Sequence, residues 1–351
     1  MSRLRVLVVE DSLTVRKRLC EVLSGDPDIE VVGEAEDGKQ AIELCLALRP
    51  DVITLDMMLP VMSGLAATEY LMAYCPTPIL VVSSSINRGE LFKTYEALAA
   101  GAVEVMEKPK ANEIEGDWER RLLGMVKLVA RVKVLTHVRG RFGARNDIPV
   151  VPSTLPPRGR QNCQIVALGA STGGPAAIVE ILRALPTGFP LPVLLVIHIG
   201  EPFGTAFADW LDGQSPHSVN IATDGMALGK PGVYMAKPDR HLVVRNHRLY
   251  LTNGPERHSC RPSVDVLFES VAIEYGASAA ACLLTGMGQD GARGLLAIRQ
   301  AGGTTIAQDE ASSVVYGMPR EAAILGAAQR VLPLNEIGAA LATLANQVRH
   351  E

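Results

Sequence analysis

The first 125 residues carry five short apolar runs of strand length, separated by segments whose apolar positions have helical spacing. The runs occupy residues 4–9, 29–35, 52–55, 79–82 and 102–106. Near-continuous apolar strands that alternate with helices are typical of a parallel sheet covered on both faces. Right-handed crossovers place the carboxyl ends of such strands along one edge, where open sheets bind their ligands. The pattern therefore predicts a doubly wound, five-stranded α/β domain.

The α/β alternation stops after a helix predicted over residues 117–135 and resumes at Gln164. Between them, residues 136–161 are basic and rich in Gly and Pro, a composition typical of an exposed linker. Strands are then predicted at 165–170, 192–197, 280–284 and 304–308, with short β-like segments between residues 232 and 252 and a helix at about 263–275. We expect domains at 1–125 and 162–351, joined by a helix end and linker at 126–161. The second domain is predicted to be doubly wound α/β with a mostly parallel sheet.

Composition and charge narrow the classes of function. Hydrophobic residues make up 48% of the chain and charged residues 21%, with a net charge of −4, so no basic surface for nucleic acid is expected. The six cysteines form no C-x-x-C pair and are interpreted as reduced thiols. No signal-peptide pattern and no apolar run of ~20 residues is found. A cytoplasmic protein without membrane insertion is predicted.

Polar side chains follow the predicted strands of the first domain. Glu10 and Asp11, Asp56, Ser83 and Lys108 each lie at the carboxyl end of a strand. Carboxylates gathered at one edge need a cation, and Mg²⁺ is the natural oxygen-ligated choice. Asp56 could accept a phosphoryl group, with Lys108 and Ser83 contacting its oxygens. Solvated surface residues are the alternative, but their shared position at strand ends favours a site.

Residues 1 to about 125 resemble the receiver domain of two-component response regulators, which has a flavodoxin-like fold. The resemblance implies that a histidine kinase phosphorylates Asp56. It also implies Mg²⁺ bound by a set of three carboxylates and one backbone carbonyl, from Glu10, Asp11, Asp56 and Met58. The sequence departs from the family at Val105, where an aromatic residue is common, which puts an aromatic rotamer switch in doubt.

A serine in the second domain follows the strand at 165–170. Residues 169–175, GASTGGP, match G-x-S-x-G and place Ser171 at a tight strand-to-helix turn. A dinucleotide-binding loop is the alternative, but its spacing is G-x-G-x-x-G and an acidic residue should follow about 20 positions later. The next strand ends in His198 instead. This favours acyl transfer.

The third candidate is Asp290, in the glycine-rich loop after the strand at 280–284. It would orient His198 as the acid of a catalytic triad does, although capping of the following helix would also explain it. The order Ser, His, Asp differs from that of the α/β-hydrolases, so membership of that superfamily is disfavoured.

Four segments, IVALGASTGGP, the His198 strand, LTGMGQDGA and AQDEASSVVYGMPREA, resemble the catalytic domain of the chemotaxis protein-glutamate methylesterases. The resemblance implies Ser171 as nucleophile, His198 as base and acid, and Asp290 as its orienter, with Thr172 and the Met287 N–H near the oxyanion. It implies methylated chemoreceptor helices as substrate, no cofactor for the esterase step, glutamine deamidation in some members and a monomer. The sequence departs from the family at residues 199–202, IGEP, where His-Met-Pro is expected.

Three points stay open at this level. Arg257 and Arg261 either contact an acidic receptor helix or form a solvated basic loop and helix-capping ion pairs. A receiver-controlled scaffold or nucleotide-binding protein without esterase activity is the alternative function. A receiver joined to a DNA-binding domain is disfavoured, because the second half has no basic recognition helix.

Overall fold

The computed structural model describes residues 3–84, 88–109, 116–132 and 163–346. The chain divides into two compact units, Met1–Ala144 and Arg145–Glu351. The predicted linker at 136–161 lies outside the described residues, so the predicted boundaries at 125 and 162 stay a prediction. Within the described part of the chain, no helix combines the length and apolarity needed to span a bilayer.

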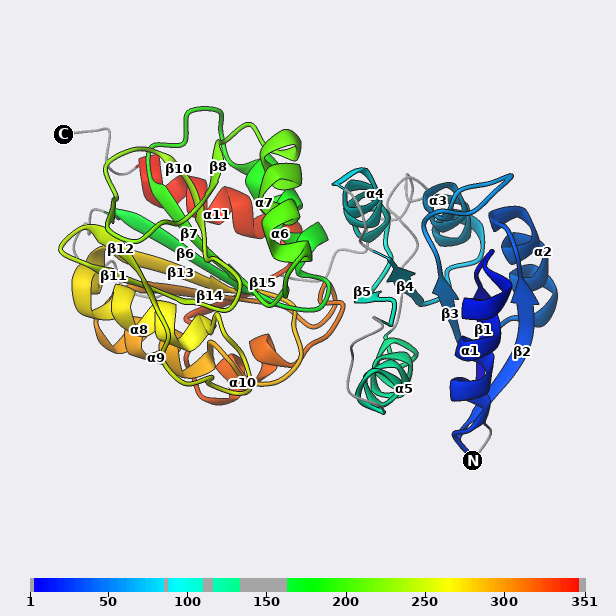
Figure 1. The fold of residues 1–351 in the computed structure, drawn as a ribbon. Helices are drawn as coiled ribbons and strands as arrows, with labels where there is room; N and C mark the ends of the chain where they lie inside the picture. The colour runs from blue at the N-terminus through cyan, green and yellow to red at the C-terminus, as the bar shows by residue number, and fades with distance from the viewer. Residues whose placement is uncertain (1–2, 85–87, 110–115, 133–162, 347–351) are drawn as a thin grey trace, which may run out of the picture. The chain divides into compact units, whose positions relative to one another are not determined.

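The first unit contains a five-stranded parallel sheet in the order β2-β1-β3-β4-β5, as the apolar runs predict. Its strands are β1 (Leu4–Val9), β2 (Ile29–Ala35), β3 (Val52–Leu55), β4 (Ile79–Ser83) and β5 (Glu104–Glu107). Its helices are α1 (Leu13–Ser24), α2 (Gly38–Leu48), α3 (Gly64–Tyr74), α4 (Arg88–Ala99) and α5 (Asp117–Val129). Helices α1 and α5 pack together, and α2, α3 and α4 pack in series (Figure 1). The doubly wound prediction is confirmed.

The second unit is built on a seven-stranded sheet in the order β15-β14-β13-β6-β7-β10-β8, with every strand pair parallel. Its strands are β6 (Ile165–Ala170), β7 (Pro192–Ile197), β8 (Val219–Ile221), β10 (Gly232–Met235), β13 (Ala279–Leu283), β14 (Thr304–Gln308) and β15 (Arg330–Leu332). A separate antiparallel sheet joins β9 (Met226–Ala227), β11 (His241–Arg245) and β12 (Arg248–Thr252). The parallel α/β prediction is confirmed.

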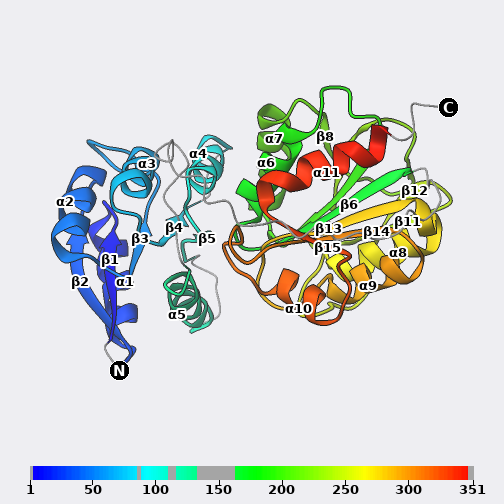
Figure 2. The same ribbon diagram turned by 180° about the vertical axis from the view of Figure 1, so that it is seen from behind.

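Helices cover both faces of the large sheet. They are α6 (Gly174–Ala184), α7 (Phe203–Gln214), α8 (Val264–Tyr275), α9 (Ala292–Gln300), α10 (Met318–Ile324) and α11 (Leu334–Asn346), with a short 3₁₀ turn, η2, at Gly276–Ser278. Figure 2 shows α11 lying with α6 and α7 on one face, while α8, α9 and α10 lie on the other.

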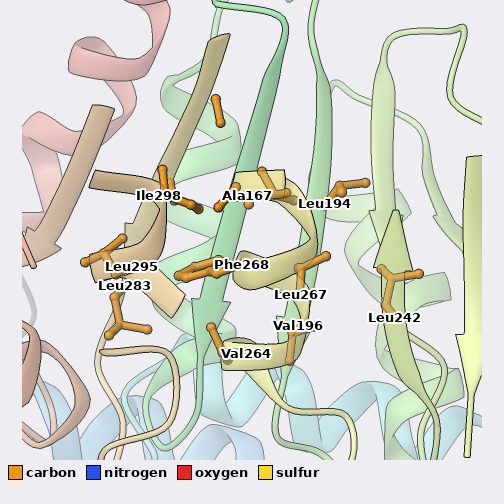
Figure 3. Packing of buried hydrophobic residues seen from close by; sticks show 14 of the residues in the cluster. Ala167, Leu194, Val196, Leu242, Val264, Leu267, Phe268, Leu283, Leu295 and Ile298 are labelled. Atoms are coloured by element: carbon orange, nitrogen blue, oxygen red, sulfur yellow. The ribbon is translucent and has the colours of Figure 1, made fainter. Parts of the chain in front are cut away.

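A hydrophobic core fills the space between the sheet and the α8–α9 pair. Phe268 and Leu267 of α8 lie against the strand residues Ala167 and Leu194, and Leu295 of α9 lies near them (Figure 3). All are almost fully buried. Because α8 is fixed on the sheet by this packing, the position of its first turn relative to the strand ends is also fixed.

Strand β6 lies at the centre of the large sheet, between β13 and β7. The chain leaves β6 toward β7 on one side and returns to β13 on the other side, so the strand order reverses next to β6. Reversals of this kind leave a crevice beyond the carboxyl ends of the strands. The loops that follow β6, β7 and β13 carry Ser171, His198 and Asp290.

Candidate functional site

Ser171 sits in the turn that directly follows β6. Its backbone N–H donates to the carbonyl of Thr285 at 3.0 Å, and its own carbonyl accepts from Gly174 N–H at 2.7 Å. Gly173 precedes α6 with a φ of 78°, a left-handed conformation that favours glycine. The sequence G-A-S-T-G-G therefore produces a tight strand-to-helix turn, as predicted, and places the serine near the start of a helix.

Close packing explains why small residues surround this serine. A Cβ atom added to Gly286 would lie 2.7 Å from the Cβ of Ser171 and 2.3 Å from the sulfur of Met318. A Cβ added to Gly169 would lie 2.2 Å from a methyl group of Val264. The loop after β13 thus packs directly on Ser171, and the first turn of α8 packs on the end of β6, so together they fix the position of the turn.

His198 follows β7 and reaches Asp290 across the sheet edge. Its backbone N–H donates to the carbonyl of Ala170 at 3.2 Å, and its Nε2 lies 2.9 Å from Asp290 Oδ2. An ionised carboxylate only accepts hydrogen bonds, so in the neutral ring Nε2 carries the proton and Nδ1 carries the lone pair. The structure brings together the predicted base and its orienter, and Nδ1 is the nitrogen that can act as a base.

Asp290 is held by a set of donors that the sequence did not reveal. Its carboxylate is almost fully buried and accepts hydrogen bonds from Ser263 Oγ at 2.7 Å, Val264 N at 2.7 Å, and Asp265 N and Gly291 N at 3.1 Å each. Burial raises the pKa of Asp290. The hydrogen bond and charge of His198, together with the Ser263 and Asp265 donors, lower it by more, so the pKa lies below its ordinary value. The carboxylate is therefore ionised and sits at the start of α8.

The alternative role of Asp290, capping of α9, is filled by a different residue. Asp265 Oδ1 accepts from Gly294 N–H at 2.7 Å in the first turn of α9. Near α9, Asp290 bonds only Gly291, the residue directly before the helix. Its other hydrogen bonds are with the start of α8 and with His198. Capping of the following helix therefore does not explain why an aspartate lies at position 290.

The protonation of His198 reflects competing effects. Burial lowers its pKa, but hydrogen bonds to Asp290 and Cys260 raise it more, to about 9. General-base catalysis needs the neutral imidazole. A large part of His198 is thus protonated at neutral pH, and the active fraction grows as the pH rises.

For the ester hydrolysis that the sequence resemblance implies, we expect the rate, as kcat/KM, to increase with pH through the neutral range. The acid limb should have an apparent pKa well above 6.5, the ordinary value for histidine. A pH profile of methanol release would measure it, after subtraction of the rate of a Ser171→Ala protein to remove spontaneous alkaline hydrolysis. A wild-type limb centred at or below 6.5 would contradict the raised pKa.

Cys260 and Ser263 are functional-site residues that the sequence reasoning missed. Cys260 Sγ lies 3.6 Å from His198 Nδ1, and Ser263 Oγ bonds Asp290. Among the described residues, no hydrogen bond joins Ser171 to His198, so Nδ1 faces the thiol instead. Ser263 could have been found as the N-cap of α8, but nothing in the sequence indicated that Cys260 would lie beside the base.

The two predicted oxyanion contributors lie in the same loops. Thr172 is buried, and its carbonyl accepts from Thr285 Oγ1 at 2.9 Å. Thr285 N–H in turn donates to Gln308 Oε1 at 2.8 Å, which ties the loop to β14. Met287 has an exposed side chain, and among the backbone hydrogen bonds of the described residues its N–H is not a donor. That amide is thus available for a ligand.

The basic residues before α8 have local partners. Arg257 forms an ion pair with Glu269 of α8 at 2.6 Å, and Arg261 donates to the carbonyl of Gly254 at 3.2 Å. The ion-pair interpretation therefore describes Arg257. In the departing segment 199–202, Glu201 Oε1 accepts from Thr205 Oγ1 at 2.7 Å, so this carboxylate braces the start of α7.

The first unit also brings its predicted polar residues together. Lys108 Nζ lies 2.8 Å from Glu10 Oε2 and 2.9 Å from Asp56 Oδ2. Burial raises the pKa of Glu10 despite its hydrogen bond to Lys108. Burial lowers the pKa of Lys108, but its bonds to Glu10 and Asp56 raise it above its ordinary value. Carboxylate oxygens of Glu10, Asp11 and Asp56 all lie within 4.8 Å of one another.

Ser83 and Met58 complete the description of this pocket. The Ser83 hydroxyl is buried without a hydrogen-bond partner among the described residues, which leaves it free for an incoming oxygen. The Met58 side chain is exposed and contacts Lys93, and the role of its carbonyl stays a prediction. Arg16 was missed: it is buried, donates to the Glu10 carbonyl at 2.6 Å and pairs with Glu36 at 2.8 Å.

Comparisons with known proteins agree with both sites. Residues 166–341 match the CheB methylesterase family model, and residues 6–116 match the response regulator receiver domain model. A protein-glutamate methylesterase/protein-glutamine glutaminase of Nitrosospira multiformis is 43% identical, covering 97% of each chain. Another relative with that name, from Anaeromyxobacter dehalogenans, is 41% identical over 97% of each chain.

A solved structure matches the second unit. The CheB methylesterase catalytic domain of Thermotoga maritima is 36% identical and has a TM-score of 0.50, covering 52% of this chain and 98% of that one. With a receiver domain before the catalytic domain and near-complete coverage of the curated relatives, the chain belongs to the CheB methylesterase family.

Proposed function

We propose that this protein is a phosphorylation-regulated protein-glutamate methylesterase that hydrolyses glutamate γ-methyl esters on chemoreceptors. One observation carries the proposal: His198 and Asp290 form a 2.9 Å pair at the sheet edge where Ser171 follows β6. The same acyl-enzyme chemistry serves glutamine deamidation, because ammonia replaces methanol as the leaving group. The relatives' double name, methylesterase and glutaminase, supports both activities.

The proposed reaction follows from which nitrogen of His198 carries the proton. Neutral His198 takes the Ser171 proton on Nδ1, while its Nε2 proton stays on the Asp290 side. Ser171 Oγ then attacks the γ-carbonyl carbon, and the resulting imidazolium is stabilised by Asp290. The imidazolium protonates the departing methoxide. Water, deprotonated by the same nitrogen, hydrolyses the acyl-enzyme and regenerates Ser171.

The oxyanion formed in each half-reaction needs fixed donors. The Met287 amide, which has no acceptor among the described residues, and the Thr172 residue beside the nucleophile are the proposed contributors. Donors of this kind are typically worth ~10²–10³ in rate. Gly286 lies against Ser171, so the amide that follows it belongs to the same rigid loop.

The receiver unit supplies the regulation. Asp56 is the proposed phospho-acceptor, Lys108 contacts it at 2.9 Å, and the free Ser83 hydroxyl would bind a phosphoryl oxygen. The carboxylates of Glu10, Asp11 and Asp56 fit Mg²⁺, which when bound neutralises phosphoryl charge, with the Met58 carbonyl as a further ligand. The proposed partners are a histidine kinase, as phosphodonor, and the methylated helices of a chemoreceptor. The protein itself is proposed to be a cytoplasmic monomer.

An Asp56→Asn variant should keep its basal esterase activity but lose stimulation by a small-molecule phosphodonor. Asparagine cannot form the acyl phosphate, and its side chain has nearly the same shape. Chelation of Mg²⁺ should abolish stimulation of the wild type in the same way. Methanol release from methylated receptor membranes measures both results. Equal stimulation of the wild type and the variant would contradict the assignment of Asp56.

A further inference from the structure

A thiol faces the catalytic base in the second unit. Cys260 Sγ and His198 Nδ1 are 3.6 Å apart, and both residues are only partly buried. A tetrahedral zinc ion holds one sulfur and one nitrogen ligand about 3.5 Å apart, given typical bond lengths. The two atoms therefore already have the separation that one zinc ion requires.

The position of the thiol is fixed by a two-residue turn. Arg257 and Cys260 exchange two backbone hydrogen bonds, of 3.1 and 2.9 Å, around His258 and Ser259. Those two central residues have φ values of 52° and 59°, a left-handed conformation that costs about 1 kcal/mol or more for each. The Arg257–Glu269 ion pair and a 3.1 Å bond between His258 and Asp265 hold the turn on α8. A strained, anchored turn thus presents Cys260 to the histidine.

The histidine is also prepared for a metal ion. In the neutral ring, Nε2–H donates a hydrogen bond to Asp290 at 2.9 Å, which leaves the lone pair on Nδ1, on the Cys260 side. A carboxylate that holds the far nitrogen of a histidine is the usual outer partner of a zinc-binding imidazole. Ligand atoms of His198, Cys260 and Asp290 all lie within 4.8 Å of one another.

We propose that His198 Nδ1 and Cys260 Sγ form a binding site for a thiophilic divalent cation such as Zn²⁺, with Asp290 orienting the imidazole and water completing the coordination. Binding would release the thiol proton, and the Nδ1 proton of the protonated fraction of His198, to the buffer and form one metal–sulfur and one metal–nitrogen bond. No oxidation or reduction is involved.

The consequence for catalysis rests on the proposed function, in which His198 is the base. The metal occupies the same lone pair that accepts the Ser171 proton. General-base catalysis contributes about 10²–10⁴ in rate, so saturating Zn²⁺ should reduce ester hydrolysis by about 100-fold or more. The cation therefore competes with the Ser171 proton for the Nδ1 lone pair of His198 and inhibits the esterase.

The test measures metal binding directly, without relying on turnover. Full-length protein is titrated with Zn²⁺ against a chromophoric chelator, and with Cd²⁺ while thiolate-to-metal charge-transfer absorption is recorded. Excess Mg²⁺ is present to occupy the acidic pocket of the receiver unit. Binding should weaken at least about tenfold in Cys260→Ser and in His198→Ala. Cys20→Ser, which removes another partly buried thiol in the other unit, should bind as the wild type does.

Two further variants separate this site from its alternatives. His258, Asp265 and Asp290 form a second cluster nearby, so His258→Gln should leave the charge-transfer band intact. Ser171→Ala should retain Zn²⁺ binding, so the site can be tested even if the esterase assignment fails. Wild-type Zn²⁺ affinity in Cys260→Ser, or loss of the band in His258→Gln alone, would overturn the proposal.

Discussion

Replacement of Ser171 by alanine is expected to abolish methanol release from methylated receptor membranes. In the proposed mechanism the Oγ atom forms the acyl-enzyme, and the other hydroxyl residue of the same turn, Thr172, is buried. Loss of the nucleophile in serine hydrolases costs up to ~10⁶ in kcat, so a fall of at least about 10³ is expected here. The fold should survive, since alanine fits wherever serine does. Radiolabelled methanol release, with and without phosphodonor, measures the effect.

A serine-to-alanine change elsewhere in the same unit provides the control. Ser278 lies in η2 and uses its backbone carbonyl to accept from Gln164 N–H at 2.8 Å, which alanine preserves. Ser278→Ala should therefore release methanol at the wild-type rate. Continued hydrolysis by Ser171→Ala would refute the nucleophile assignment. Absence of hydrolysis in the wild type as well, by a protein that accepts phosphate, would favour a receiver-controlled scaffold.

Substitution of Asp290 by asparagine should reduce both activity and stability. The amide would direct N–H groups at the Val264, Asp265 and Gly291 amides or at His198, so donors would face donors in a buried pocket. An unsatisfied buried donor costs about 1–3 kcal/mol. His198 would also lose the carboxylate that fixes its tautomer, and a comparable change in a serine protease lowers kcat by about 10⁴.

Asp265→Asn separates the two effects. Asp265 is equally buried and accepts from Gly294 at the start of α9, but the histidine that its carboxylate bonds is His258 and not His198. The Asp265→Asn substitution should lower the unfolding midpoint without the large loss of kcat that is expected for Asp290→Asn. Chemical denaturation and methanol-release kinetics on both variants give the comparison. If the two variants lost activity in proportion to stability alone, Asp290 would have no orienting role.

The candidate residues at the strand ends could be predicted from the sequence, because each directly follows a recognisable apolar strand. Ser171 and His198 directly follow fully apolar strands, and the shared edge of a parallel sheet places them in neighbouring loops. The short strands β8, β9 and β15 were not predicted. They are three residues or fewer and carry partly exposed side chains, so they have no apolar run to detect.

The contacts around the base depend on distant segments and could not be predicted. Cys260 meets His198 across 62 positions, and Ser263 meets Asp290 across 27. These approaches are set by the packing of α8 on the sheet through Phe268 and its neighbours. Apolar periodicity predicts that α8 packs, but it does not predict which side chains of the preceding turn meet the site.

The position of Asp290 also limits how this catalytic domain can diverge. One carboxylate bonds His198, the proposed base, accepts from the first amides of α8 and contacts the residue before α9. A descendant that lost this carboxylate would lose part of its fold together with its chemistry. A lineage that gave up hydrolysis and kept only a signalling role should therefore keep Asp290 and mutate Ser171 first, so an intact aspartate alone is weak evidence of activity.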